Sequence, residues 1–116
     1  MSGNVIVFGW KRSLPGREKI SAQHFQDFLQ YMGGEKQKGT IDSFEPVLLN
    51  PTGGDLTGFF LIRGEPGKLA ALTGSPEWVQ HITRAMLHLD NAAVWTGVGG
   101  AMVQDRMDIW MKTLPA

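Results

Sequence analysis

The chain has 116 residues, which suits one domain with one hydrophobic core. Its 11 lysines and arginines balance its 11 aspartates and glutamates, so no field of one sign would attract nucleic acid or an anionic membrane. The absence of cysteine excludes disulfides, thiolate nucleophiles and sulfur-ligated metals. Its apolar runs are far shorter than the ~20 residues that span a bilayer, so we expect a soluble, cytoplasmic protein without nucleic-acid or membrane partners.

The first predicted elements are a strand and a helix. Residues 4–10 are rich in β-branched and aromatic side chains and end before a turn signal at 13–16. Ser21 is suited to cap a helix, and the pair Gly33-Gly34 indicates its stop or a break. The apolar stripe of this helix has the 3.6-residue period and consists of Phe25, Phe28, Leu29 and Met32.

The rest of the chain predicts two more strands, a second helix, a fourth strand and a terminal helix. Ser75 is a good N-cap for the second helix, and Pro76 suits its first position. Strands are predicted at 41–49, 56–63 and 92–96, a short helical turn at 68–73, and the second helix at 76–89. The terminal helix carries one apolar stripe, formed by Val103, Met107, Trp110 and Leu114.

This order is βαββαβ with an added C-terminal helix, which predicts an α+β class and a ferredoxin-like sheet with two helices on one face. Residues 5–8 and 59–62 are apolar on both faces of their strands. A sheet with one wet face should alternate instead, so the second face also needs a cover. We expect a second copy to supply it, sheet against sheet in a homodimer, and the terminal helix is the rival cover.

With the Ser-Pro-Glu-Trp opening of the second helix at 75–78, these features resemble the dimeric α+β barrel superfamily. That group includes YCII-related domains and small cofactor-free or haem-degrading monooxygenases, and the resemblance implies the fold and a homodimer. YCII-related domains carry a histidine with a proposed catalytic role on the first helix, and His24 is the residue that resembles it.

Haem-degrading members of the group use an asparagine on the first strand, a tryptophan on the third and an axial histidine on the second helix. Asn4 and His81 lie in comparable elements, but the strand at 56–63 has no tryptophan. The set is incomplete, so we expect no haem and no other cofactor.

The glycine cluster at 97–100 raises the possibility of a phosphate loop. Met102 stands where a dinucleotide fingerprint requires its third glycine, and 14 residues remain after it, so the fingerprint fails. We interpret the glycines as relieving steric crowding where a strand bends into the terminal helix. A weaker anion site near that helix stays open, with nearby cations from Lys36, Lys38, Arg63 and Lys68.

The three histidines give different signals. His81 and His88 are seven residues apart, or ~10 Å along a helix, so one metal cannot bind both, and solvated or capping roles are expected. His24 shares a stripe with Phe28 and Tyr31, from which its imidazole can reach a cleft between helix and sheet. A histidine there can act as a general acid or base.

These signals predict a metal-free enzyme for a small organic substrate bound in a helix–sheet cleft. The candidate catalytic residues are His24 and Tyr31, and the candidate substrate-binding residues are Trp10, Glu45, Arg63 and Trp95. Glu45 lies within an apolar strand, so it must face solvent at an edge or pair with a donor such as Arg63. The alternative is a non-catalytic dimeric binding or interaction module, which scattered site residues would favour.

Overall fold

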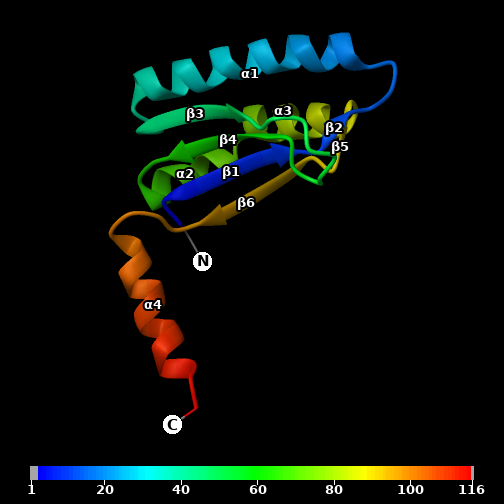
Figure 1. Cartoon of the computed structure of the whole chain (residues 1–116). Helices are drawn as coiled ribbons and strands as arrows, with labels where there is room; N and C mark the ends of the chain where they lie inside the picture. The colour runs from blue at the N-terminus through cyan, green and yellow to red at the C-terminus, as the bar shows by residue number, and fades with distance from the viewer. Residues whose placement is uncertain (1–2, 116) are drawn as a thin grey trace.

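The computed structural model describes residues 3–115 and shows an antiparallel sheet with helices on one of its faces. The sheet has the strand order β3-β4-β1-β6, and all of its pairings are antiparallel (Figure 1). Its strands are β1 (Val5–Trp10), β3 (Ser43–Leu48), β4 (Gly58–Arg63) and β6 (Ala93–Gly97). The α+β class and the four main strands are confirmed, and the order is compatible with a ferredoxin-like fold.

Four helices and a small ribbon complete the described residues. The helices are α1 (Glu18–Lys38), α2 (Pro66–Thr73), α3 (Pro76–Met86) and α4 (Met102–Thr113). The ribbon joins β2 (Arg12–Ser13) to β5 (Leu89–Asp90). None of the described helices is both long enough and apolar enough to cross a membrane.

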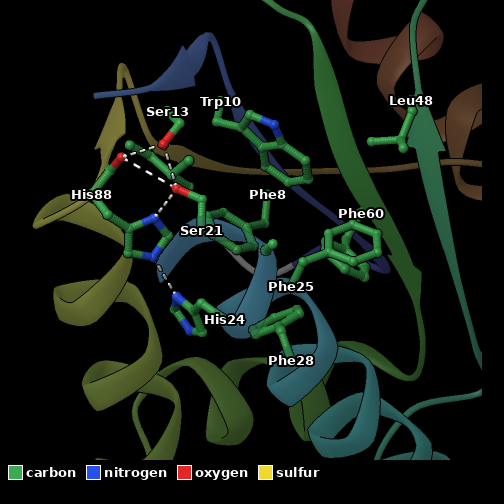
Figure 2. Close-up of a pocket in the computed structure, with 12 residues that line it drawn as sticks. Phe8, Trp10, Ser13, Ser21, His24, Phe25, Phe28, Leu48, Phe60 and His88 are labelled. Carbon is green, nitrogen blue, oxygen red and sulfur yellow. Dashed lines mark hydrogen bonds between the residues drawn. The ribbon is translucent and has the colours of Figure 1, made fainter. Parts of the chain in front are cut away.

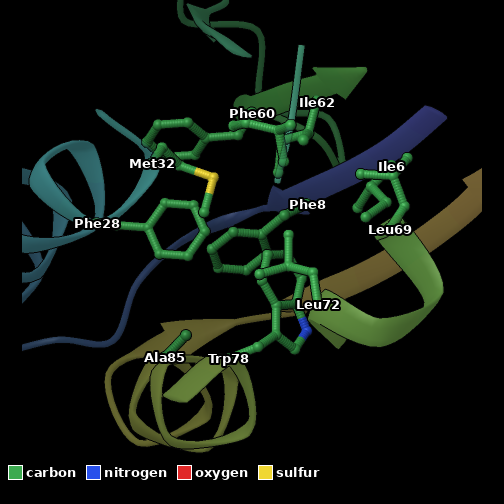
Figure 3. Packing of buried hydrophobic residues seen from close by; sticks show 11 residues of the cluster. Ile6, Phe8, Phe28, Met32, Phe60, Ile62, Leu69, Leu72, Trp78 and Ala85 are labelled. Atoms are coloured by element: carbon green, nitrogen blue, oxygen red, sulfur yellow. The ribbon is translucent and has the colours of Figure 1, made fainter. Parts of the chain in front are cut away.

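The hydrophobic core lies between one face of the sheet and the helices α1, α2 and α3 (Figure 3). Alternate strand residues face this side, because successive side chains of a strand point to opposite faces. The core residues are Ile6, Phe8, Phe28, Met32, Ile41, Phe60, Ile62, Leu69, Leu72, Trp78 and Ala85. This packing fixes the position of α1 against α3, on which the site described below depends.

The boundaries of α1 differ from the prediction. The helix begins three residues before Ser21, whose backbone N–H donates to the carbonyl of Arg17, so Ser21 is not its cap. It also continues through Gly33-Gly34 to Lys38 and ends at Gly39, whose φ of 80° is left-handed. Tertiary packing of the buried Met32 and Glu35 outweighs the low helix propensity of the two glycines.

The boundaries of α3 agree with the prediction at its start and differ at its end. The Ser75 hydroxyl accepts a 3.3 Å hydrogen bond from the Trp78 N–H, as the cap signal predicted. The helix stops at Met86 rather than Leu89, because Leu89 and Asp90 instead pair with Ser13 and Arg12 in the ribbon. Sequence analysis did not anticipate this ribbon.

The opposite face of the sheet, here called the open sheet face, is not covered by any of the described helices (Figure 1). Strand pairing places its apolar side chains together: Val5, Val7, Val47, Phe59, Leu61 and Trp95. The helix α4 extends away from the sheet, and none of its residues is buried. In the single chain, therefore, α4 is not the cover that the open sheet face needs.

Candidate functional site

A cavity of about 240 Å³ lies between α1 and the core face of the sheet. Most of its wall is aromatic or aliphatic, from Phe8, Trp10, Ala22, Phe25, Phe28, Leu48, Phe60 and Leu89. Its polar side chains, Ser13, Ser21, His24 and His88, gather on one side (Figure 2). A ligand in this cavity would meet apolar surface everywhere except at that one polar edge.

The polar side chains belong to a continuous chain of hydrogen bonds, here called the histidine relay. It begins with Ser13 Oγ, 2.7 Å from Ser21 Oγ, which in turn lies 2.7 Å from Nδ1 of His88. The other nitrogen of His88, Nε2, is 2.7 Å from Nδ1 of His24. Nε2 of His24 is then 3.0 Å from Nδ1 of His81. The relay therefore connects the cavity with the outer side of α3.

Three elements hold the relay in place. Ser21 and His24 are three residues apart and so share one face of α1. His81 lies on α3, while His88 follows the end of that helix, and its carbonyl accepts a 2.8 Å hydrogen bond from the Leu14 N–H. The pairing of Ser13 with Leu89 in the ribbon keeps the Ser13 hydroxyl beside this turn.

The relay has two arrangements in which every ring is neutral, because a neutral imidazole has one donor and one acceptor nitrogen. In one, Ser21 donates to His88, His88 to His24 and His24 to His81. In the other, all three hydrogen bonds run in the opposite direction. When one proton crosses each link, while Ser21 takes up a proton from outside the relay and His81 releases its Nε2 proton, one arrangement becomes the other, which is what a proton-conducting chain requires.

Burial keeps these rings neutral. His24 and His88 are 3% and 2% exposed. Burial, followed by the positive charge of Arg84, lowers the pKa of His24 to about 4. The same two causes lower the pKa values of His81 and His88, and Arg17 contributes further to the lowering at His88. All three rings are therefore neutral at neutral pH, and each keeps one acceptor nitrogen for its hydrogen bonds.

The geometry of the relay does not suit a metal ion. His24 bonds to its two neighbours through opposite ring nitrogens, so the three rings do not point their nitrogens at one centre. Within residues 3–115, no group of three or more histidine or carboxylate side chains is arranged to hold a metal.

At its outer end the relay reaches a second, polar hollow of about 420 Å³ at the surface. His81 is partly exposed there, beside Glu77 and the ion pair in which Arg84 donates to Asp27 at 2.8 Å. The ring of Tyr31 stacks on His81 with centroids 4.5 Å apart. The buried Tyr31 hydroxyl has no hydrogen-bond partner among the described residues, and burial raises its pKa.

The predicted site residues lie in three separate places. His24 and Trp10 line the cavity, and Tyr31 lies outside it against His81. Glu45, Arg63 and Trp95 pair with Leu61, Val5 and Val7, which places them on the open sheet face. Glu45 is exposed on the edge strand β3, which is the solvent-facing alternative considered for it. The six residues therefore do not share one pocket.

The glycine cluster has a structural partner. The Asn4 side-chain amide donates to the Gly99 carbonyl at 3.0 Å, and its oxygen accepts from the Gly99 N–H at 2.8 Å. Two of the cations considered for an anion site have other contacts: Lys68 donates to the Gly39 carbonyl at 3.1 Å, and Lys38 lies 3.6 Å from the Glu35 carboxylate. These contacts support the interpretation of the glycines as a bend.

Sequence reasoning missed Ser13, Ser21 and the joint role of His81 and His88. It expected solvated or capping roles for those two histidines, which is wrong for His88, because that side chain is buried after the end of α3. It also did not consider a third ring between them. The available signal was the Ser21/His24 spacing on α1 together with a seven-residue histidine spacing at α3, which becomes informative once the two helices are packed together.

Comparison with known proteins adds no assignment. No protein-family model matches the chain, and no curated protein and no solved structure shows significant similarity to it. Inference about its function therefore depends on the geometry of the site.

Proposed function

We propose that this protein is a metal-free enzyme that transfers a proton to or from a small, largely apolar organic molecule in the cavity. The observation that carries the proposal is the histidine relay, which runs from a cavity wall to the surface through hydrogen bonds of 2.7–3.0 Å. Buried polar networks are costly unless every member is satisfied. Two helices can pack together without any buried polar network. We therefore attribute a function to the three histidine rings that join the apolar cavity to the polar hollow.

The transfer proceeds by balanced steps in the first proton arrangement. The ligand gives its proton to Ser21 Oγ as Ser21 gives its own to Nδ1 of His88. His88 passes its Nε2 proton to His24, and His24 passes its Nε2 proton to Nδ1 of His81. One proton thus leaves the ligand and one arrives at His81, which borders solvent. The reverse sequence protonates a ligand.

The cavity indicates the class of substrate. Its walls are mainly aromatic, and its volume lies below the ~300 Å³ at which typical ligand pockets begin. The substrate is therefore a compact aromatic or alicyclic molecule with one hydroxyl, carbonyl or acidic C–H group directed at Ser21. His24 keeps the acid–base role predicted from sequence, but as the middle member of a chain rather than as the group that touches substrate.

The proposal includes the assembly. The strand order and the two unlike faces of the sheet support a ferredoxin-like domain that forms a homodimer by burying the open sheet face against a second copy. Trp95, 52% exposed, lies on that face, which is more typical of an interface than of a substrate wall.

A non-catalytic dimeric binding module is the second candidate. It is favoured by the separation of Glu45, Arg63 and Trp95 from the cavity. In this case the cavity would hold a ligand without exchanging a proton with it.

The photoacid 2-naphthol distinguishes the two candidates. It has an aromatic body with one O–H group, and it becomes a strong acid when excited, so its emission reports whether a neighbouring group accepts its proton. We expect probe bound to the wild-type protein to emit as naphtholate, because Ser21 and His88 pass the proton onward. The variant His88→Leu should bind the probe and emit as neutral naphthol.

Two controls complete the experiment. The probe 2-methoxynaphthalene has the same aromatic body without the proton, and it should bind in both proteins with unchanged emission. His81→Phe keeps an aromatic ring stacked on Tyr31 but removes the imidazole that accepts the proton at the solvent end of the relay. Naphtholate emission should therefore fall with little change in affinity. Neutral emission from wild-type protein with tight binding would support the binding module, and absence of binding would overturn both candidates.

A further inference from the structure

The terminal helix α4 is a formed helix that packs no buried residue against the rest of the described chain. Its 12 residues include none that is buried. Its stripe residues Val103, Met107 and Trp110, and Leu114 just after its end, are 42–52% exposed. Isolated helices shorter than ~12–15 residues are marginal in water, so most helix stability comes from packing of an apolar face. The stripe of α4 therefore requires a surface that residues 3–115 of this chain do not supply.

The overall dimensions agree with this conclusion. A compact monomer of 12.8 kDa exposes about 6,300 Å², whereas this chain exposes 7372 Å². The radius of gyration is 15.8 Å, against about 13 Å for a compact chain of this length. The excess surface, about 1,100 Å², is comparable with the ~800 Å² that each partner buries in a stable interface.

Each copy also carries a surface that suits the helix. The open sheet face is apolar, and its six-residue strands β1, β3 and β4 measure ~20 Å, close to the ~18 Å length of α4. Neither surface has a net charge that would repel a second copy. The helix has two acidic and two basic residues, Asp105, Asp108, Arg106 and Lys112, and the open sheet face has Glu45 and Arg63.

The start of α4 is held so that the helix leaves its own domain. The side chain of Asn4 makes two hydrogen bonds with the backbone of Gly99, and Gly100 has a left-handed φ of 59°. This bend directs the chain outward, where α4 extends beyond the sheet (Figure 1). A connection whose direction is fixed in this way is expected for a helical arm that packs against another molecule.

We propose that α4 is an exchanged arm, which packs its apolar stripe against the margin of the open sheet face of a second copy. This inference rests on the homodimer proposed above and adds the part of the chain that holds it together. The opposite side of α4 carries Asp105, Asp108 and Lys112 with the single apolar residue Ile109 beside them, so the helix lies at the rim of the dimer with that side in solvent, rather than between the two sheets.

Photo-crosslinking tests the exchange directly. Met111, at the edge of the stripe, is replaced by p-benzoylphenylalanine, and the protein is prepared as a mixture of ¹⁵N-labelled and unlabelled chains. We expect crosslinked peptide pairs with one labelled and one unlabelled member, joining α4 to strands of the open sheet face. The same amino acid at Asp105, on the polar side of α4, should give few crosslinks.

A matched pair of variants measures the contribution of the arm. Because no residue of α4 is buried in the part of the chain that the structure describes, Trp110→Glu should leave the circular dichroism spectrum unchanged at concentrations where the variant is still dimeric, and should weaken dimerisation at least tenfold in sedimentation equilibrium. Lys112→Glu, on the polar side, should leave the dimer intact.

The possible outcomes separate the two proposals. A dimer whose α4 crosslinks stay within one chain, or that tolerates Trp110→Glu, would overturn the exchange and leave the homodimer standing. A monomer at micromolar concentration would overturn both. The proton-transfer proposal is tested separately by the naphthol probe.

Discussion

The two faces of the sheet differ less in sequence than in what covers them. Phe59 and Phe60 are neighbours in β4, yet Phe60 is 1% exposed beneath α1, while Phe59 is half-buried on the open sheet face. The covered face carries the core, the cavity and the relay, and the open sheet face carries mainly apolar side chains together with Glu45 and Arg63. The titratable side chains of the relay thus lie on the covered face, and the open sheet face is the one that the proposed homodimer buries.

The largest expected effect comes from truncating the two phenylalanines. Phe60→Ala removes a ring that packs on Phe8 and Phe28, so it should lower the free energy of unfolding by about 3–5 kcal/mol at any protein concentration. Phe59→Ala should have a smaller effect that grows as protein concentration rises, because in the proposed homodimer the lost contacts are in the interface. Urea unfolding at two protein concentrations measures both losses. If the two variants lose equal stability at both concentrations, the two faces of the sheet do not differ as described.

The pH dependence of stability should reveal the relay on the covered face. In the unfolded chain His24 takes up a proton near pH 6.5, whereas in the folded protein its pKa is about 4. Lowering the pH through this window favours unfolding, so the free energy of unfolding should be highest above pH 6.5 and fall toward pH 4. The contribution of His24 is up to about 3 kcal/mol.

His81 and His88 act in the same direction, since their pKa values are also lowered. The nearby Asp27, whose pKa is held below 3.8 by the hydrogen bond from Arg84, titrates beneath the window. His24→Gln should therefore make the profile between pH 4 and 6.5 shallower, as measured by urea unfolding at each pH. A wild-type profile that is flat across this window would contradict neutral burial of the three rings.

The smallest expected effect concerns the joint between the domain and its arm. Asn4→Ala removes two partly buried hydrogen bonds to Gly99 and should lower the free energy of unfolding by about 1–2 kcal/mol. It should also weaken dimerisation in sedimentation equilibrium, because the orientation of α4 relative to its own domain is no longer fixed. In Asn4→Asp the acceptor for the Gly99 N–H remains, so the loss should be intermediate. Unchanged dimerisation in Asn4→Ala would show that the two hydrogen bonds between Asn4 and Gly99 do not hold α4 in the orientation that the dimer requires.

Much of the secondary structure was predictable because its signals are local. The Ser75-Pro76 start of α3 acts within one turn, and the strands follow from runs of β-branched and aromatic residues. The failures occurred where distant packing outweighed local preference. Gly33-Gly34 reads as a stop, but the buried residues on either side hold it in helix, and the cap signal at Ser21 marks a relay member instead.

The sequence by itself determined the order of the main helices and of the four strands of the large sheet, the apolar character of those strands and the placement of His24 on the face of α1 that meets the sheet. Only the tertiary structure decided that His24 lies between His88 and His81, 64 and 57 residues away along the chain. It also decided that α4 leaves the sheet uncovered. The physical reason is range: propensity and capping act over about four residues, whereas the meeting of side chains from α1, α3 and the ribbon depends on how whole elements pack.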